Sequence, residues 1–150
     1  LEFGDAVAIA IGDNAARREW FDKAMAAGWS LPNIVHPTAF VSEYAQLGRG
    51  NIVNAGAIIN ARVVIGDNCI INTGAIVEHE TQIESHCHIG PGARIAGRVK
   101  IGGESFLGIG SIVIDQITLG SGVTVGAGAA VVQNVGDACT VVGVPARSIR

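Results

Sequence analysis

Residues 52–77, IVNAGAIINARVVIGDNCIINTGAIV, contain a regular repeat. In this stretch an aliphatic residue returns at every sixth position: Val53, Ile59, Ile65, Ile71 and Val77. The same period extends from Val35 to Val131, and all seventeen positions are Val, Ile or Leu. The residue four places after each aliphatic residue is usually small, and the residue directly after each aliphatic residue is often Gly or Asn.

A period of six fits neither an α-helix nor the simple alternation of a strand. It suits a coil of short strands that turns at every sixth residue, with three turns closing one triangular coil of a parallel β-solenoid. The aliphatic side chains are expected to fill the interior. We expect the Gly or Asn directly after each of them to adopt the left-handed backbone of a corner.

Residues eighteen apart are expected to stack on one another in such a coil. This places Cys69 below Cys87 and Asn54 below Asn72. The asparagines are expected to form a hydrogen-bonded ladder at a turn. The cysteines allow two interpretations, a disulfide or two small thiols that fill a corner.

The bulk properties of the 150 residues exclude several classes of protein. The net charge of -3 provides no basic field for nucleic acid or an acidic membrane. No apolar run approaches the roughly 20 residues of a membrane span. No signal peptide is visible in a chain that starts at Leu1, and its three cysteines form no C-x-x-C pair. We therefore expect a reduced, cytoplasmic protein.

Residues 1–33 do not follow the period and are expected to form a partial α/β domain. AVAIAIG, residues 6–12, predicts a buried strand, and Asp13 or Asn14 can cap a helix that ends at Gly28. One strand and one helix cannot bury a core of their own, so the segment must pack on the coil or on a part that is absent. It resembles the last strand–helix unit of a small Rossmann-like domain whose first part is missing. Residues 34–150 then form the coil and a tail, in which Pro145 forbids a central strand.

Four short motifs join the six-residue period: IAIGDN at residues 9–14, IVHPTA at 34–39, VEHE at 77–80 and VVGVPAR at 141–147. Together they resemble the bacterial sugar acyltransferases of the hexapeptide superfamily. The similar subgroup contains the bacillosamine-pathway UDP-4-amino-sugar N-acetyltransferases and the sialic-acid O-acetyltransferases. The resemblance covers nearly the whole chain. The family's glycine-rich nucleotide-sugar loop has no counterpart in these residues.

The resemblance implies a left-handed β-helix, acetyl-CoA as acyl donor, no metal, and a homotrimer with active sites between subunits. It also implies that residues 1–33 belong to a nucleotide-sugar-binding domain, with Gly12 against the sugar nucleotide. Direct transfer to the 4-amino group of the sugar is expected, because no cysteine lies at the matching position. The family's contacts with CoA fall on His88, Ile109 and Ala127, and the last two are eighteen residues apart and therefore stack.

The catalytic hypothesis concerns the dipeptide His79–Glu80. Histidine has a pKa near the working pH and suits a general base, and a carboxylate near its other ring nitrogen stabilises the imidazolium that forms. The resemblance implies these roles for His79 and Glu80. Neighbouring residues on a strand point to opposite faces, so the pair requires a corner or a contact across subunits. His88 is expected to stabilise the oxyanion through its ring or its backbone N–H. His86, expected on the same strand, is interpreted as structural or supporting.

Three alternatives differ in chemistry. The acceptor can be a hydroxyl, which would make the protein an O-acetyltransferase of sialic acid or another surface sugar. The three histidines at 79, 86 and 88 suggest a zinc-dependent carbonic anhydrase-like β-helix, although their spacing is a poor match. A non-enzymatic or ice-binding solenoid is the third, but regular Thr-x-Thr rows are absent.

Overall fold

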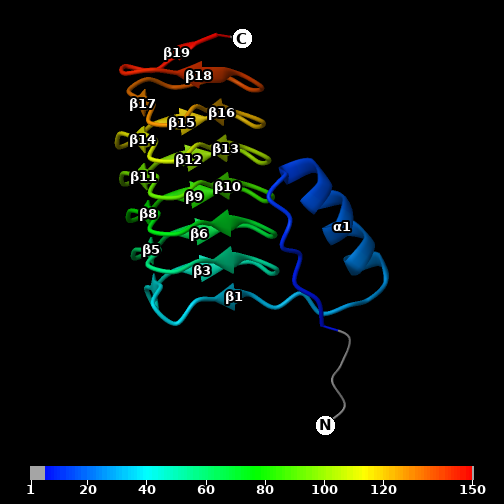
Figure 1. Ribbon diagram of the computed structural model, residues 1–150. Coiled ribbons are helices and arrows are strands. Elements are labelled where there is room, and N and C mark those ends of the chain that lie inside the picture. Colours follow the sequence, from blue (N-terminus) through cyan, green and yellow to red (C-terminus); the bar gives the residue numbers. More distant parts are fainter. Residues whose placement is uncertain (1–5, 150) are drawn as a thin grey trace.

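The computed structural model describes residues 6–149, which form a parallel β-solenoid with one helix along its side (Figure 1). Its strands build three faces, which we name A, B and C. Each strand up to Ile112–Val113 pairs in parallel with the strand eighteen residues further on, for example Ile34 with Ile52 and Ile52 with Ile70. The predicted fold class is confirmed.

The strands of the three faces alternate along the chain. Face A contains β1 (Ile34–Val35), β4 (Ile52–Val53), β7 (Ile70–Ile71), β10 (His88–Ile89), β13 (Phe106–Leu107), β16 (Thr124–Val125), β18 (Thr140–Val142) and the antiparallel β19 (Arg147–Ser148). Face B contains β2 (Phe40–Val41), β5 (Ile58–Ile59), β8 (Ile76–Val77), β11 (Arg94–Ile95), β14 (Ile112–Val113) and β17 (Ala130–Val131). Face C contains β3 (Gln46–Leu47), β6 (Val64–Ile65), β9 (Gln82–Ile83), β12 (Lys100–Ile101) and β15 (Thr118–Leu119).

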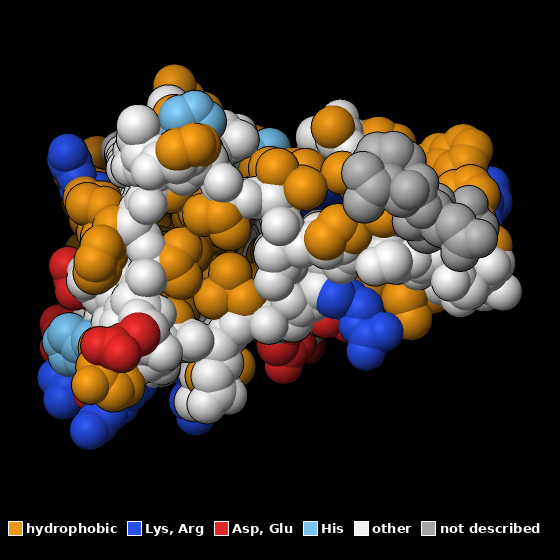
Figure 2. All heavy atoms as spheres, turned by 90° about the horizontal axis from the view of Figure 1, so that it is seen from below, with side chains coloured by type: hydrophobic (Ala, Val, Ile, Leu, Met, Phe, Trp, Pro, Cys, Tyr) orange, Lys and Arg blue, Asp and Glu red, His pale blue; other side chains and the backbone are white. Residues whose placement is uncertain are grey.

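The period of six predicts the core well. Of the seventeen aliphatic positions, the fourteen from Val53 to Val131 are at most 2% exposed. Val41 and Leu47 are partly buried and Val35 is 44% exposed, because no coil lies below the first one. The view from below shows hydrophobic side chains in the centre of this open end (Figure 2).

The predicted position of the left-handed corner residues is wrong. From Leu47 to Val125, positive φ angles occur at the third residue after each aliphatic position, for example at Gly56 and Arg62, and not at the residue directly after it. The glycines directly after the aliphatic residues have another function. A Cβ at Gly90 would lie 2.4 Å from the carbonyl oxygen of Leu107, so the next coil passes too close for a side chain.

The edges of the coil differ in their corner residues. On the A–B edge the left-handed residues are all glycine: Gly56, Gly74, Gly92, Gly110 and Gly128. On the B–C edge they are Arg62, Glu80, Arg98 and Gln116, with φ between 58° and 61°. A non-glycine residue in this region costs on the order of 1 kcal/mol. The A–B edge therefore exposes bare backbone, and the B–C edge carries long polar side chains despite this cost.

The stacking predictions are confirmed for the asparagines, and the cysteines are free thiols. Asn54 Nδ2 donates to Asn72 Oδ1 at 2.9 Å. Cys69 and Cys87 are buried, and their Sγ atoms lie within hydrogen-bonding distance of the carbonyl oxygens of Glu84 and Gly102, at 3.2 and 3.3 Å. The interpretation as corner-filling thiols holds.

The helix α1 (Asn14–Ala26) begins and ends as its sequence predicts. The side chain of the N-cap Asp13 accepts a hydrogen bond from the Ala16 N–H, and Gly28 follows the C-cap with φ 77°. The strand predicted at residues 6–12 is wrong. In the described part of this segment only Ala6 bridges to another residue, Ser30, because the segment climbs across the coils and does not run alongside a strand (Figure 1).

Arg17 joins α1 to the coil. Arg17 is 1% exposed, and its guanidinium donates to the carbonyl oxygens of Asn68 and His86 on the C–A edge and to those of Ile11 and Gly12. Burial lowers the pKa of Arg17, but these hydrogen bonds satisfy the group. Residues 6–149 contain no helix that is long and apolar enough to span a membrane.

Candidate functional site

His79 and Glu80 lie at the corner where the chain passes from β8 on face B to β9 on face C. Glu80 has a φ of 61°, so the backbone turns sharply at this dipeptide. His79 Nδ1 and Glu80 Oε2 are 3.4 Å apart. The corner that the pairing requires is therefore present within one chain.

Arg62 holds the other oxygen of the Glu80 carboxylate. Arg62 lies one coil below on the same edge, and its Nη1 is 3.5 Å from Glu80 Oε1. All three side chains line a hollow of about 430 Å³ together with Tyr44 and Ala61. The Arg62–Glu80 pair is largely exposed and contributes little to stability. Its consequence is geometric, since it keeps the second carboxylate oxygen directed at His79.

Gly97 leaves the space that the His79 ring occupies. It lies eighteen residues after His79, and a Cβ at this position would be 2.7 Å from Cε1 and 2.8 Å from Nε2 of the ring. Within residues 6–149 no protein group forms a hydrogen bond with His79 Nε2, and the side chain of His79 is 51% exposed. With Nδ1 facing a carboxylate, Nε2 can accept a proton from a bound molecule.

The other predicted site residues lie elsewhere in the same chain. His88 belongs to β10 on face A, and Ile109 and Ala127 lie on the A–B edge, where Gly128 N donates to the Ile109 carbonyl. Ile109 is 60% exposed and Ala127 is exposed as well. One chain therefore does not bring His79 together with His88, Ile109 and Ala127, since these residues belong to different sides of the coil.

His88 and Gly12 do lie together. His88 Nδ1 is 3.1 Å from the Gly12 carbonyl oxygen, and its Nε2 is 3.0 Å from Asn72 Nδ2. The ring packs edge-on against Phe106, with 5.2 Å between the ring centroids. Burial is the main cause of the lowered pKa of His88. Both ring nitrogens are thus engaged by protein groups.

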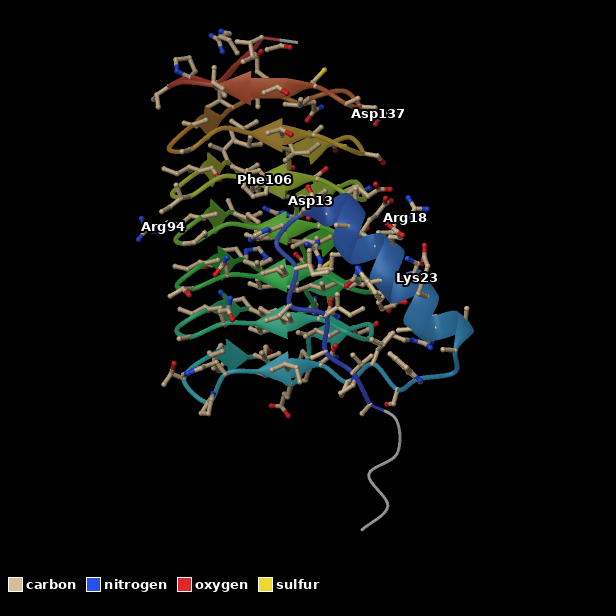
Figure 3. All side chains as sticks on the ribbon, turned by 45° about the vertical axis from the view of Figure 1, so that its right-hand side comes forward. Asp13, Arg18, Lys23, Arg94, Phe106 and Asp137 are labelled. Carbon is tan, nitrogen blue, oxygen red and sulfur yellow. The ribbon has the colours of Figure 1, made fainter. Side chains whose placement is uncertain are left out.

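Gly12 borders a hollow of about 480 Å³ on face A. The start of α1 provides one wall, and Phe106 and Thr124 provide another. The side chains of Asp13 and Phe106 both belong to this side of the molecule, and Arg94 lies on the opposite side (Figure 3). A Cβ at Gly12 would meet no atom within 4 Å, so the space beside it is open.

The prediction that His86 shares a strand with His88 is wrong. His86 is a corner residue with φ 66°, and β10 begins at His88. Its ring packs against Phe21 of α1, with 5.6 Å between centroids, and its Nδ1 is 2.8 Å from Asn68 Nδ2. His86 therefore holds the helix on the C–A edge.

Sequence reasoning missed Arg62, Asn72 and Gly97 as parts of the site. The spacing of eighteen residues is the signal that finds two of them, because Arg62 lies below Glu80 and Gly97 lies above His79. Asn72 was expected only in a structural ladder. Within residues 6–149, no three His, Cys, Asp or Glu side chains are grouped to hold a metal ion.

Comparison with known proteins identifies relatives of this architecture. Residues 62–97 match the family model described as bacterial transferase hexapeptide (six repeats). No curated protein sequence matches the chain. PerB from Caulobacter crescentus, solved with CoA and GDP-perosamine, is 44% identical, with a TM-score of 0.96 over 97% of this chain and 70% of PerB.

A second relative is the acetyltransferase domain of PglB from Neisseria gonorrhoeae, solved with acetyl coenzyme A. It is 42% identical, with a TM-score of 0.95 over 96% of this chain and 70% of that domain. WeeI from Acinetobacter baumannii, 24% identical with a TM-score of 0.95, shares the fold. The identity and coverage of the first two show that the chain belongs to the family of hexapeptide-repeat β-helix acetyltransferases that includes PerB and the PglB acetyltransferase domain.

Proposed function

We propose that this protein transfers an acetyl group from acetyl-CoA to the amino group of a nucleotide-linked amino sugar, with His79 as the general base. The observation that carries the proposal is the His79–Glu80 pair, whose ring Nε2 is free while Nδ1 faces a carboxylate. The relatives support the choice of both substrates. PerB is a GDP-perosamine N-acetyltransferase, and its structures contain CoA and GDP-perosamine together.

The position of His79 Nε2 fits a direct transfer of the acetyl group. The amine nitrogen attacks the thioester carbonyl carbon and forms the C–N bond, while His79 Nε2 takes the proton that the nitrogen loses. The C–S bond then breaks, and CoA leaves as a thiol with this proton. Glu80 stabilises the imidazolium while it carries the proton. Transfer is direct, because Cys69 and Cys87 are buried and Cys139, which is only partly buried, lies beside the C–A edge of the last coil and not on the edge that carries His79.

The A–B edge is the proposed site of CoA. Ile109 and Ala127 are stacked there, and the glycine corners leave no side chain between them and a long ligand. Such a bare edge allows close approach of the pantetheine arm to the backbone. Both ring nitrogens of His88 are bonded to protein groups, so no ring N–H of His88 is placed in contact with the donor.

A homotrimer would bring the two edges together. Face B presents an apolar outer column, interrupted by Arg94: Phe40, Ile58, Ile76, Ile112 and Ala130. The N-terminal segment lies over part of face A, and the outer column of face C is mostly polar. If three B faces surround one axis, the B–C edge of each chain meets the A–B edge of the next. His79 of one chain then lies beside Ile109 and Ala127 of its neighbour.

The sugar nucleotide is proposed to bind at the hollow beside Gly12 on face A. In the trimer this face adjoins the A–B edge and therefore the His79 of the neighbouring chain. Residues 6–33 are thus proposed to supply one wall of the sugar site. The free thiols fit a reducing compartment, and we propose the cytoplasm.

The proposed function is tested by following thiol release from acetyl-CoA with a panel of nucleotide-linked 4-amino sugars and their 4-hydroxy analogues. The amino sugars are expected to react, and NMR of the product should locate the acetyl group on nitrogen. Reaction of the hydroxy sugars alone would identify an O-acetyltransferase. No thiol release with either set would contradict the proposal.

Replacing Ala127 with tryptophan is expected to raise KM for acetyl-CoA at least about tenfold, since the indole would occupy the exposed edge on which the donor lies. The oligomeric state should not change. Ala55→Trp is the matched control, because Ala55 lies on the same edge but below the level of His79. An unchanged KM in the Ala127 variant would move the CoA site away from this edge.

A further inference from the structure

The orientation of the Asn72 amide is fixed by its neighbours. The backbone N–H of Thr73 donates to Asn72 Oδ1 at 2.8 Å, and Asn54 Nδ2 donates to the same oxygen at 2.9 Å. Because a backbone N–H can only donate, this atom must be the amide oxygen. The atom that faces His88 Nε2 at 3.0 Å is therefore the amide nitrogen.

This orientation determines the tautomer of His88. An amide nitrogen is a donor, so His88 Nε2 must be the acceptor, and the proton of the neutral ring lies on Nδ1. His88 Nδ1 then donates to the Gly12 carbonyl oxygen at 3.1 Å. The hydrogen bonds thus run in one direction, from Asn54 through Asn72 and His88 to Gly12.

The N-terminal segment depends on few such contacts. The described part of this segment forms one bridge, at Ala6. At its other end Arg17 Nη1 donates to the Ile11 carbonyl at 3.0 Å, and His88 Nδ1 and Arg17 Nη1 both donate to the Gly12 carbonyl, each at 3.1 Å. Directly after the segment, Asn14 Nδ2 donates to the Glu104 carbonyl at 2.9 Å. Both lone pairs of the Gly12 oxygen are used. The edge-on contact with Phe106 fixes the plane of the His88 ring.

We propose that His88 is a positioning residue for the sugar site: it anchors the Gly12 carbonyl, and Asn72 sets the tautomer that makes this possible. The inference rests on the proposed function only in placing the sugar nucleotide beside Gly12. It differs from the role expected from the sequence, because a ring with both nitrogens bonded has no N–H to offer an oxyanion. The backbone N–H of His88 is also engaged, by the Ser105 carbonyl at 2.9 Å.

Two substitutions test the contributions of the two ring nitrogens of His88 separately. In His88→Asn the amide nitrogen can stand where Nδ1 stands and keep the bond to Gly12. In His88→Gln the amide reaches the position of Nε2, so the contact with Asn72 is kept and the bond to Gly12 is lost. We expect His88→Gln to raise KM for the sugar nucleotide about tenfold, with KM for acetyl-CoA unchanged. His88→Asn should stay within about twofold of the unsubstituted protein.

Histidine-selective ¹⁵N NMR of the unsubstituted protein tests the tautomer without any activity measurement. We expect the His88 proton on Nδ1, and a proton on Nε2 would overturn the proposal. The kinetics of His88→Gln and His88→Asn would overturn the proposal if both variants raise KM for acetyl-CoA and leave KM for the sugar nucleotide unchanged, because the His88 ring would then serve the donor. Failure of the proposed function would appear separately, as no acetyl transfer by the unsubstituted protein.

Discussion

Replacing His79 with alanine is expected to lower kcat by about 10²–10⁴-fold and to leave KM for acetyl-CoA nearly unchanged, since a positioned general base typically contributes this much. His79 is the described histidine whose side chain is half exposed and whose Nε2 has no protein hydrogen-bond partner while Nδ1 faces a carboxylate. Steady-state thiol release with a nucleotide-linked amino sugar measures both parameters.

Two further substitutions control this result. Glu80→Gln removes the charge that stabilises the imidazolium and is expected to lower kcat less than His79→Ala does. His36→Ala removes another exposed histidine, whose Nδ1 faces Thr38 Oγ1 in the first coil, and should leave kcat unchanged. If His79→Ala retains near-normal turnover, the base is another group and the assignment fails.

The largest effect on stability is expected from Ile89→Asp. Ile89 is fully buried in the middle of the coil, where a carboxylate would find neither water nor a partner. The cost of burying an unpaired charge is comparable with the whole stability of a domain, so the variant should not fold. Circular dichroism and light scattering of the purified protein measure this.

Gln82→Asp is the matched control, because Gln82 is exposed on face C and lies directly before the buried Ile83. This variant adds the same charge outside the core and should melt within a few degrees of the unsubstituted protein. A folded Ile89→Asp variant with a normal melting temperature would contradict the assignment of the period to the interior.

The core was predictable because a single spacing places each aliphatic side chain inside the coil. The error at the corners has a physical reason. Glycine appears directly after the aliphatic residue because the next coil passes within 2.4 Å of a Cβ there, as at Gly90, and not because the backbone is left-handed. A pattern of glycines does not distinguish these two causes. The strand at residues 6–12 failed for another reason, since its composition is strand-like but its partners are not beside it.

The site was predictable in part. His79 and Ile109 differ by thirty in residue number, which is not a multiple of eighteen. The spacing alone could therefore have placed them on different sides of the coil. The tautomer of His88 could not be predicted from the sequence, since it depends on the orientation of the Asn72 amide, which hydrogen bonds from Thr73 and Asn54 fix. The His79–Glu80 pair required a corner that the sequence alone did not predict. This corner depends on the positive φ of Glu80.

If each active site combines His79 of one chain with the A–B edge of the next, two variants that are each defective alone should restore activity when their chains assemble together. Chains carrying His79→Ala and chains carrying Ala127→Trp are mixed in equal amounts, unfolded, and reassembled together. If the site is shared, one of the three sites in each mixed trimer combines an intact His79 with an intact Ala127. Random assembly then makes about a quarter of all sites intact, so thiol release should return to about a quarter of the unsubstituted rate at low acetyl-CoA. Activity no higher than that of the two variants reassembled separately would contradict the claim.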